Sequence, residues 1–297
     1  SKILPGTWVF RLKRNPDGEI VKFKGRYCVR GDMQEGVFDT YAPVVAWSTV
    51  RFFLIFSITF DWYTCSIDFS NAFVQSVLKD DVWIHLPRGF RSSRGPNTCL
   101  KLKKSLYGLS VAPKLWYETL SKALLAEGFK QSKNDKCFFY KEGFLIVLYV
   151  DDAGLAVKNP DDIDKLLNSL RAKGFEMTRE SSFAEFLGIK FVKDNETGTL
   201  TLTQKGLINK IIEATGMENC NPNWVPAAKE GLGIDPDGEP MEEAWNMKSI
   251  VGMLLYLSTN SRPDIAYAVS QIGRFTHSPK KSHAAAVKTI VRYLHRT

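Results

Sequence analysis

The spacing of hydrophobic and polar positions predicts strands in the first part of the chain. Residues 7–30 alternate in character on both sides of the turn residues 15–18, which predicts a β-hairpin rich in basic side chains. The apolar run 49–60 predicts a buried helix capped by Ser48, and residues 63–68 predict a strand that passes into a turn or a helix.

Helical spacing of apolar residues becomes clearer further along. One helix is predicted from Ala112 to a stop at Gly128. A second has Asn159 as its cap, Pro160 in its first turn and Gly174 as its stop. Two strands joined by a turn are predicted between these helices.

The last third of the chain is predicted to be a hairpin followed by helices. Residues 183–204 predict a hairpin that turns at 195–198, and a helix is expected to end before Gly216. Proline and glycine are concentrated in residues 220–240, which predicts a linker. Three helical patterns follow, at 243–258, 263–275 and 279–295. Strands and helices without strict alternation predict an α+β fold with a helical tail.

The helix predicted at 279–295 combines an apolar stripe with a basic one. Pro279 is expected in its first turn and Ser278 as its cap. Its basic face comprises Lys280, Lys281, Lys288, Arg292 and Arg296, opposite an apolar face of Val287, Ile290, Val291 and Leu294. Three histidines in or near it match no metal motif and are expected at the solvated surface: His277, His283 and His295.

Composition indicates an ordinary globular chain with a basic excess. Of its 297 residues 44% are hydrophobic and 24% are charged, which argues against disorder, and the formal net charge is +8. Such a charge favours a polyanionic partner without establishing one. The five cysteines form no C-x-x-C pair, so neither a zinc site nor a disulfide framework is predicted. The apolar run 50–60 is too short for a membrane span, and a chain that starts without Met is interpreted as a piece of a longer protein.

Three Asp-Asp doublets occur in the chain, and they differ in their surroundings. Asp161 and Asp162 fall in a helix first turn, where the helix dipole favours carboxylates, and residues 80–81 lie in a polar segment. Only Asp151 and Asp152 interrupt an apolar, β-prone run, at residues 144–157. This doublet is therefore the one that calls for a chemical explanation.

Two adjacent carboxylates in apolar surroundings require protonation or a bound cation, because a desolvated charge costs several kcal/mol, roughly. Oxygen ligands of this kind suit Mg²⁺, which also binds substrate phosphates. Asp68 ends another apolar stretch and is expected beside the doublet, which would give a site for two ions about 3.5–4 Å apart. A solvated turn without metal is the alternative explanation of the doublet.

The tetrapeptide Tyr149-Val150-Asp151-Asp152 inside an apolar hairpin resembles the polymerase signature of reverse transcriptases. Further segments resemble the copia-type retrotransposon branch in the order which that family shows: TYAPVV (40–45), IDFSNAF (67–73), LPRGF (86–90), SLYGL (105–109), LYVDD (148–152), FLGI (186–189) and SRPDIAYAV (261–269). The resemblance spans Trp8 to Thr297 and points to the RNA-dependent DNA polymerase region of a retrotransposon Pol polyprotein.

The resemblance implies a right-hand polymerase fold. Such a fold has fingers, a palm built on a ferredoxin-like (split βαβ) core, a small thumb and a helical connection segment. The implied boundaries are 1–45 and 76–112 for the fingers, 46–75 and 113–192 for the palm, 193–222 for the thumb, 223–240 for a linker and 241–297 for the connection segment.

The same resemblance implies roles for individual residues. Asp68, Asp151 and Asp152 match the catalytic, metal-binding aspartates, and the main-chain carbonyl of Phe69 is expected to contact metal as well. The implied cofactor is a pair of Mg²⁺ ions, with Mn²⁺ as a substitute. The implied dNTP-binding residues are Lys22, Lys24, Arg26, Arg30, Phe73, Tyr107 and Gly108, and the implied primer and template residues are Tyr149, Leu187 and Gly188. Among these, Arg26 best matches the family's finger arginine, and Phe73 is expected to exclude a ribose 2′-hydroxyl.

The implied activity is DNA synthesis from a primer on an RNA or DNA template with dNTPs, by two-metal-ion nucleotidyl transfer. Ribonuclease H and integrase regions of the same polyprotein are expected partners that this chain does not contain, and no membrane partner is expected. The implied location is intracellular, in a cytoplasmic virus-like particle, with entry into the nucleus as an option.

Two segments depart from the family's pattern. Residues 107–113 read YGLSVAP, with Ser110 and Val111 where a lysine and a glutamine are usual, and residues 25–28 read GRYC where ARLV is usual. One alternative is therefore a catalytically decayed, nucleic-acid-binding remnant of such an element, against which the three carboxylates argue. Another is an RNA polymerase or nucleotide cyclase with the same metals, against which the aromatic Phe73 argues.

Overall fold

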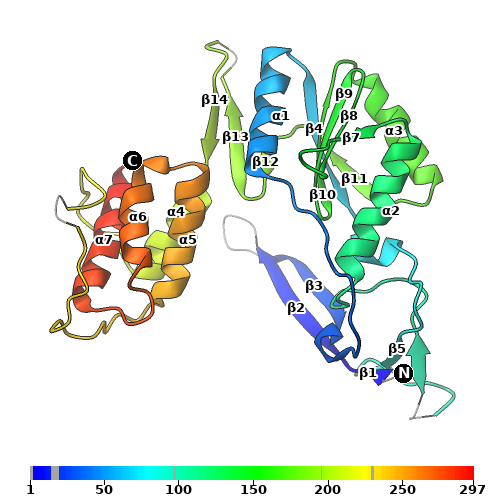
Figure 1. The fold of residues 1–297 in the computed structure, drawn as a ribbon, viewed down its shortest axis with the longest axis horizontal. Coiled ribbons are helices and arrows are strands. Elements are labelled where there is room, and N and C mark those ends of the chain that lie inside the picture. Colours follow the sequence, from blue (N-terminus) through cyan, green and yellow to red (C-terminus); the bar gives the residue numbers. More distant parts are fainter. Residues whose placement is uncertain (1–2, 15–19, 96–97, 195, 229–230) are drawn as a thin grey trace. The chain divides into compact units, whose positions relative to one another are not determined.

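The computed structural model describes residues 3–14, 20–95, 98–194, 196–228 and 231–297 (Figure 1). These residues form two compact units, Ser1–Phe183 and Ala184–Thr297, which are considered one at a time. The predicted turn at 15–18 and the start of the predicted turn at 195–198 lie outside the described residues.

A six-stranded antiparallel sheet forms the centre of the first unit. Its strand order is β11-β4-β10-β9-β8-β7. The bounds are β4 Tyr63–Phe69, β7 Lys130–Gln131, β8 Phe138–Lys141, β9 Phe144–Tyr149, β10 Asp152–Val157 and β11 Met177–Glu180. All but the last residue of β9 are buried, which explains why its sequence is continuously apolar rather than alternating.

Three helices pack on this sheet: α1 Trp47–Thr59, α2 Ala112–Ala126 and α3 Asp161–Ala172. Figure 1 shows α1 on one side of the sheet and α2 and α3 on the other. Along the chain the elements β4, α2, β9, β10, α3 and β11 form a β-α-β-β-α-β sequence whose strands are ordered β11-β4-β10-β9. The helices α2 and α3 therefore each connect two parallel strands that have one antiparallel strand between them.

The predicted helix ends hold in one case and fail in another. The predicted stop Gly174 follows α3 with φ of 89°, whereas Pro160 directly precedes the helix instead of lying in its first turn, and Asn159 Oδ1 accepts a hydrogen bond from Asp161 N. The predicted cap Ser48 is wrong, because α1 already begins at Trp47. A distant carboxylate holds this helix start, since Asp135 Oδ2 accepts from Ala46 N (2.9 Å) and from Thr49 Oγ1 (2.6 Å).

The remainder of the first unit consists of a long hairpin and a small sheet. The hairpin pairs β2 (Gly6–Arg14) with β3 (Ile20–Val29). The small sheet has the order β1-β5-β6, with β1 Ile3–Leu4, β5 Trp83–His85 and β6 Cys99–Lys101. Two short 3₁₀ helices, η1 Gly31–Met33 and η2 Ala72–Gln75, follow β3 and β4.

The second unit joins a three-stranded sheet to a helical core. The sheet consists of β12 Glu185–Phe186, β13 Ile189–Lys193 and β14 Leu200–Thr203. The helices are α4 Lys205–Thr215, α5 Met247–Asn260, η3 Pro263–Ile265, α6 Ala266–Gly273 and α7 Lys281–Arg296. Their apolar faces pack together around fully buried residues such as Leu254, Val269 and Ile290.

Two predictions for the last helix are wrong. It begins at Lys281 with Lys280 as its cap, so Ser278 and Pro279 lie before it. His283 is fully buried rather than solvated, although His277 and His295 are exposed as expected. Its Nδ1 accepts from Lys280 N, its Nε2 lies 2.9 Å from the carbonyl oxygen of Gly233, and its ring stacks on Phe275. Burial is possible because both ring nitrogens have partners.

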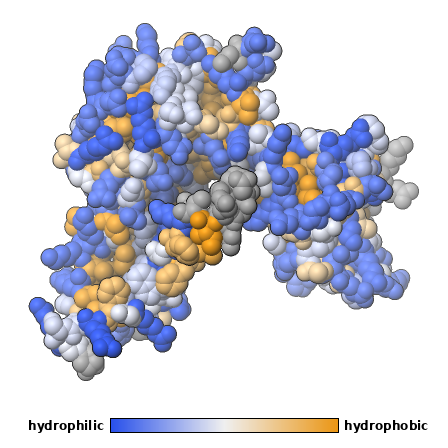
Figure 2. All heavy atoms as spheres, turned by 180° about the vertical axis from the view of Figure 1, so that it is seen from behind, coloured by the Kyte–Doolittle hydropathy of each residue, from blue (hydrophilic) through white to orange (hydrophobic). Residues whose placement is uncertain are grey.

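The face of the molecule seen in Figure 2 is mostly polar. Figure 2 shows hydrophilic residues over most of the face seen there, with hydrophobic residues in separate patches. Among the helices of the described residues, none combines the length and the apolar character that crossing a membrane requires. All five cysteines are free thiols.

Candidate active site

The three Asp-Asp doublets differ in the structure as they do in the sequence. Asp81 forms an ion pair with Lys101 (2.7 Å). Asp161 and Asp162 lie in the first turn of α3, where Asp162 also pairs with Lys165. For Asp151 and Asp152 no lysine or arginine within ion-pair distance is found among the described residues. Only the third doublet therefore keeps its charge without a cationic partner.

This doublet lies at the turn between β9 and β10, directly beside Asp68. The turn residues are Val150 and Asp151, and Tyr149 pairs with Asp152 across it. Asp152 is also the register partner of Asp68 on β4, so the two side chains extend from the same face of the sheet. Two predicted site residues that are 84 positions apart in the sequence (Asp68 and Asp152) thus become cross-strand neighbours.

Burial and neighbouring negative charges both raise the pKa of Asp152. That pKa is raised from 3.8 to about 6, first by partial burial and then by the negative charges of Asp151, Asp68 and Glu180. The residue as a whole is exposed, so desolvation affects the carboxyl end next to its neighbours rather than the entire side chain. A cation placed here would remove this repulsion.

The donor chemistry fits a hard divalent cation, although the ligand cluster is not closed. Carboxylate oxygens are what Mg²⁺ binds in proteins, together with water and substrate phosphates. Within the described residues, however, no three side chains of Asp, Glu, His or Cys converge tightly enough to hold a metal ion by themselves. The aspartates therefore offer suitable donor atoms, and Asp68 and Asp152 are neighbours, but they do not form a complete ligand set. Phe69 is adjacent as well, since its N–H donates to the carbonyl of Asp151 (2.8 Å).

A buried aromatic cluster lies on the opposite face of the sheet from Asp68. Phe69 and Phe175 pack edge-on against Trp116 of α2, with ring centroids 5.2 and 6.0 Å from it. Trp116 Nε1 donates a hydrogen bond to the carbonyl oxygen of Val150 (2.5 Å). The sequence predicts the helix that contains Trp116 but assigns this residue no role in the site. The available signal was that a buried indole N–H needs a partner.

Three of the predicted nucleotide-binding residues gather near the carboxylates. The Tyr107 pKa is raised mainly by burial, lowered by Arg26 and raised again by Asp151 and Asp68, which places its hydroxyl within their field. The Arg26 guanidinium lies over the Tyr107 ring, 5.0 Å from its centroid, and Phe73 meets the same ring edge-on at 4.9 Å. Arg26 Nε is buried without a hydrogen-bond partner among the described residues.

Gly108 connects this group to the end of β3. It has φ of 91°, and a Cβ atom built on it would lie 2.0 Å from the carbonyl oxygen of Val29, so only glycine fits. Tyr107 and Gly108 carbonyls accept from the N–H groups of Val29 and Gly31. The two unusual residues next to it are accommodated: Ser110 Oγ bonds the Gly31 carbonyl, and Val111 packs against the local core.

Strand alternation separates a basic from an aromatic face on the β2–β3 hairpin. Lys22, Lys24 and Arg26 are spaced by two residues and share one face. Arg30 lies beyond β3, and its guanidinium makes a two-pronged contact with Asp32 (2.8 and 2.7 Å). Of the four predicted cationic residues, Arg26 therefore approaches the carboxylates, whereas Arg30 is engaged elsewhere.

The predicted primer and template residues fall in different places. Tyr149 is next to the doublet, at the end of β9. Leu187 and Gly188 belong to the second unit, where they form the turn between β12 and β13 with φ of 54° and 73°. The Leu187 carbonyl accepts from the Tyr256 hydroxyl (2.6 Å).

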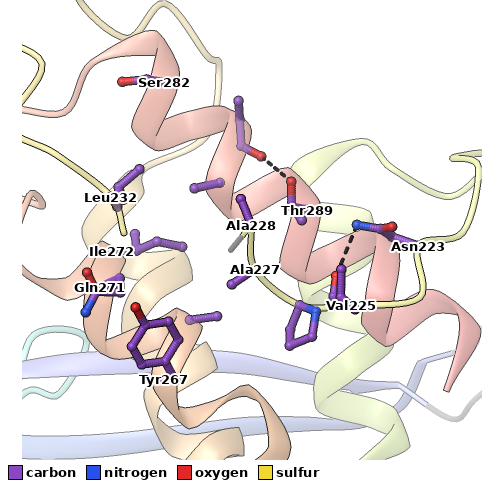
Figure 3. Close-up of a pocket in the computed structure, with 14 residues that line it drawn as sticks. Asn223, Val225, Ala227, Ala228, Leu232, Tyr267, Gln271, Ile272, Ser282 and Thr289 are labelled. Atoms are coloured by element: carbon purple, nitrogen blue, oxygen red, sulfur yellow. Dashed lines mark hydrogen bonds between the residues drawn. The ribbon is translucent and has the colours of Figure 1, made fainter. Parts of the chain in front are cut away.

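A hollow of about 350 Å³ also occurs in the second unit. Figure 3 shows it between α6, α7 and the segment that contains Asn223 and Val225. Its lining is apolar or neutral and includes Tyr267, Gln271 and Thr289. No lining residue is charged, and none of them belongs to the carboxylate group.

Sequence comparisons identify the family of the chain. The sequence model of the family described as reverse transcriptase (RNA-dependent DNA polymerase) matches residues 1–229, well over half of the chain. The chain belongs to this reverse transcriptase family. Its matched region contains all three aspartates and the residues gathered around Tyr107.

Relatives of this reverse transcriptase domain are Pol polyproteins of transposons. It is 33% identical over 98% of its length to the retrovirus-related Pol polyprotein from transposon TNT 1-94 of Nicotiana tabacum. It is 34% identical over 97% of its length to the corresponding polyprotein from transposon RE1 of Arabidopsis thaliana, and 25% identical over 99% to the transposon Ty1-H Gag-Pol polyprotein of Saccharomyces cerevisiae. The chain covers only 23%, 20% and 17% of these three relatives.

Proposed function

We propose that this domain is an active reverse transcriptase of a retrotransposon Pol polyprotein, which extends a primer with dNTPs on RNA and DNA templates by two-metal-ion nucleotidyl transfer. The observation that carries the proposal is the unneutralised carboxylate group formed by Asp68, Asp151 and Asp152 at the β9–β10 turn. The +8 net charge of the chain suits a nucleic-acid substrate.

The proposed architecture is the right-hand polymerase fold. The β-α-β-β-α-β order of the main sheet supports a ferredoxin-like palm in residues 46–75 and 113–192, with the aspartates at its turn end. The hairpin and small sheet support fingers at 1–45 and 76–112. The thumb (193–222), linker (223–240) and connection segment (241–297) complete the assignment.

The aspartates are proposed to hold two Mg²⁺ ions, or Mn²⁺ in their place, with the Phe69 carbonyl as a further ligand. Ions bound there would lower the pKa of the primer 3′-hydroxyl and neutralise charge on the triphosphate. The 3′-oxygen then forms a bond to the α-phosphorus, and the bond from that phosphorus to pyrophosphate breaks. The protein positions both reactants, and no side-chain nucleophile is needed.

The residues around Tyr107 are proposed to hold the incoming dNTP. Arg26, whose buried Nε lacks a hydrogen-bond partner among the described residues, can donate to a phosphate oxygen and can be supported by Lys22 and Lys24 from the same strand face. Arg30 would have to leave Asp32 to take part. Gly108 keeps Tyr107 against β3, and Tyr149, Leu187 and Gly188 are proposed to contact primer or template.

Phe73 is proposed to select deoxynucleotides. It is half-buried and fixed against Tyr107, so its ring can occupy the space that a ribose 2′-hydroxyl needs. We expect Phe73→Val to raise the ratio of rNTP to dNTP incorporation, measured as kcat/KM, while dNTP extension persists. A folded variant with an unchanged ratio would contradict this role and leave Phe73 as a core residue.

We also propose the partners and the cellular location of this domain. Ribonuclease H and integrase regions of the same polyprotein are expected partners, and a virus-like particle within the cell is the expected location, with nuclear entry as an option. The names of the relatives support only the polyprotein context.

Primer extension on an RNA template with dNTPs and Mg²⁺ tests the proposed function directly, with Asp151→Ala as the comparison. Extension by the parent that Asp151→Ala abolishes supports the proposal. Template–primer binding without extension by either protein would instead favour the decayed, nucleic-acid-binding remnant.

A further inference from the structure

We propose that Trp116 is a positioning residue of the active site, whose indole N–H holds the β9–β10 turn in the conformation that keeps Asp151 and Asp152 beside Asp68. This inference rests on the proposed polymerase function for its catalytic consequence. Its structural part can be tested separately.

The turn that carries the aspartates is strained. Val150 has φ of 54°, a left-handed conformation that β-branched residues rarely adopt. Nothing in the Val150 side chain favours this conformation, since it is 39% exposed and too weakly packed to enforce it. Strain of this kind persists only where the surroundings over-determine the backbone.

Trp116 supplies such a constraint from the opposite side of the sheet. Its side chain is 1% exposed, and its N–H donates to the carbonyl of the strained residue at 2.5 Å. If that bond is broken, both a buried donor and a turn carbonyl lack their partner, which is costly. The hydrogen bond therefore favours the strained turn over relaxed alternatives.

The same indole also contacts the other half of the carboxylate group. Its ring packs edge-on against Phe69, the residue after Asp68, and Phe69 N–H bonds the Asp151 carbonyl. One side chain thus touches the β4 end through Phe69 and the turn through Val150. Because Phe69 and Asp68 extend from opposite faces of the strand, Trp116 reaches the carboxylates only through the backbone.

The test compares Trp116→Phe, which removes the N–H and keeps a ring, with Phe175→Leu as the matched control. Phe175 belongs to the same aromatic cluster but makes no bond to the turn. We expect Trp116→Phe to lower kcat about 10- to 100-fold with little change in the KM for dNTP, because small displacements of reacting groups have effects of this size. The Mg²⁺ concentration for half-maximal rate should rise, and Phe175→Leu should change neither quantity.

Two further measurements keep the result decisive. If Trp116→Phe fails to fold, a benzothienylalanine at position 116, which replaces the N–H by sulfur at nearly unchanged shape, takes its place. Val150→Gly in the Trp116→Phe background should recover part of the missing rate, because glycine adopts positive φ without strain. A merely structural role of the tryptophan predicts no such recovery.

Readouts without catalysis separate this inference from the proposed function. Mg²⁺ should raise the Tm of the parent and of Phe175→Leu more than that of Trp116→Phe, and the Trp116 indole proton should exchange slowly in the parent. An inactive parent that shows these differences would refute the polymerase proposal alone. Equal Mg²⁺-induced Tm shifts, or an unchanged kcat in Trp116→Phe, would overturn the role of Trp116.

Discussion

The carboxylates at the β9–β10 turn and the basic residues of α7 differ in whether the fold provides partners for their charges. At the turn, Asp68, Asp151 and Asp152 lie together without a lysine or arginine ion-pair partner among the described residues, and the pKa of Asp152 rises to about 6. On α7, by contrast, each basic residue meets the segment of residues 218–228 and 231–243, here called the strap.

The strap contacts account for the whole basic face predicted for this helix. Lys281 pairs with Glu239 and Glu242, and Lys288 pairs with Glu243. The others are Lys280 Nζ on the Gly238 carbonyl, Arg292 Nε on the Asn221 carbonyl and the Arg296 guanidinium over the Trp224 ring. These cations stabilise the second unit internally, so net charge alone does not tell which basic residues can meet a phosphate.

A charge therefore becomes a functional candidate when the protein provides no counterion for it. A neutralised pair contributes little chemistry and modest stability. A group of like charges is maintained at a cost to stability, and that cost is recovered only when a ligand of opposite sign binds. Each prediction below tests one side of this contrast.

The largest effect is expected from the turn carboxylates. Asp68→Asn, Asp151→Asn and Asp152→Asn should each lower primer extension about 10³-fold, because metal ions supply several kcal/mol of transition-state stabilisation. Template–primer affinity should be largely kept. Glu243→Gln on the strap, which removes one carboxylate of a neutralised pair, serves as control and should extend primers at the parent rate. A turn variant as active as this control would show that the metal site is wrongly assigned.

Nucleic-acid binding should separate the two basic regions. Lys22→Ala with Arg26→Ala should weaken template–primer binding and reduce the slope of log K against log salt by about 0.7–0.9 for each phosphate that is no longer neutralised. Lys281→Ala with Lys288→Ala should leave that slope unchanged, since both lysines already have carboxylate partners. Salt titrations of fluorescence anisotropy provide the measurement. If the slope of log K against log salt fell in the α7 variant instead, the basic face of α7 and not the β2–β3 hairpin would be the region that neutralises phosphates.

Removing one turn charge should stabilise the metal-free protein. The folded-state pKa of Asp152 (about 6) lies above its ordinary value of 3.8. The stability that the protonated carboxyl provides is therefore fully present below pH 3.8 and is lost as the pH rises through 6. Discounted for solvent screening of an exposed group, Asp152→Asn should gain about 1 kcal/mol at neutral pH.

That gain corresponds to an increase in Tm of roughly 2–4 °C for a domain of this size. The difference between variant and parent should shrink as the pH is lowered to about 4, where the parent carboxyl is protonated as well. Differential scanning fluorimetry with a metal chelator measures it. A constant difference across this pH range would mean that the raised pKa is not its cause.

The smallest effect concerns a strap ion pair. Lys288→Met keeps the apolar part of the side chain and removes its bond to Glu243, which should destabilise the second unit by no more than about 1 kcal/mol. Denaturant unfolding followed by tryptophan fluorescence measures this change. Asp152→Met at the turn should act in the opposite direction, and a loss of stability there would weaken the contrast.

Parts of the site could be predicted from the sequence because their signals are local. An apolar run broken by Asp151 and Asp152 indicates a strand pair with an unusual turn, and the capping residues around α3 are local as well. The pairing of Asp68 with Asp152 depends on which strands become neighbours, and it was expected from chemistry and resemblance rather than from periodicity.

Other features depend on contacts between distant segments and were missed or mistaken. The hydrogen bond from Trp116 to Val150 cannot be predicted from the residues around either partner. The same is true of the hydrogen bond by which Asp135 holds the start of α1. His283 was expected in solvent because its helix is basic, yet the strap carbonyl of Gly233 allows its burial. Composition indicated a linker in residues 220–240, but not that its described residues are bonded along α7.

The most direct test is the stabilisation of the protein by Mg²⁺ in the absence of nucleic acid and dNTP. Ions that bind only the folded state raise its stability by RT ln(1 + [L]/Kd). At about pH 7.5 and constant ionic strength, Tm should rise with Mg²⁺ concentration in the parent and in Glu243→Gln, whereas Asp68→Asn and Asp152→Asn should start from a higher Tm and respond far less. A parent that does not respond to Mg²⁺, or turn variants that respond as strongly as the parent, would contradict the assignment of the turn carboxylates as the metal site.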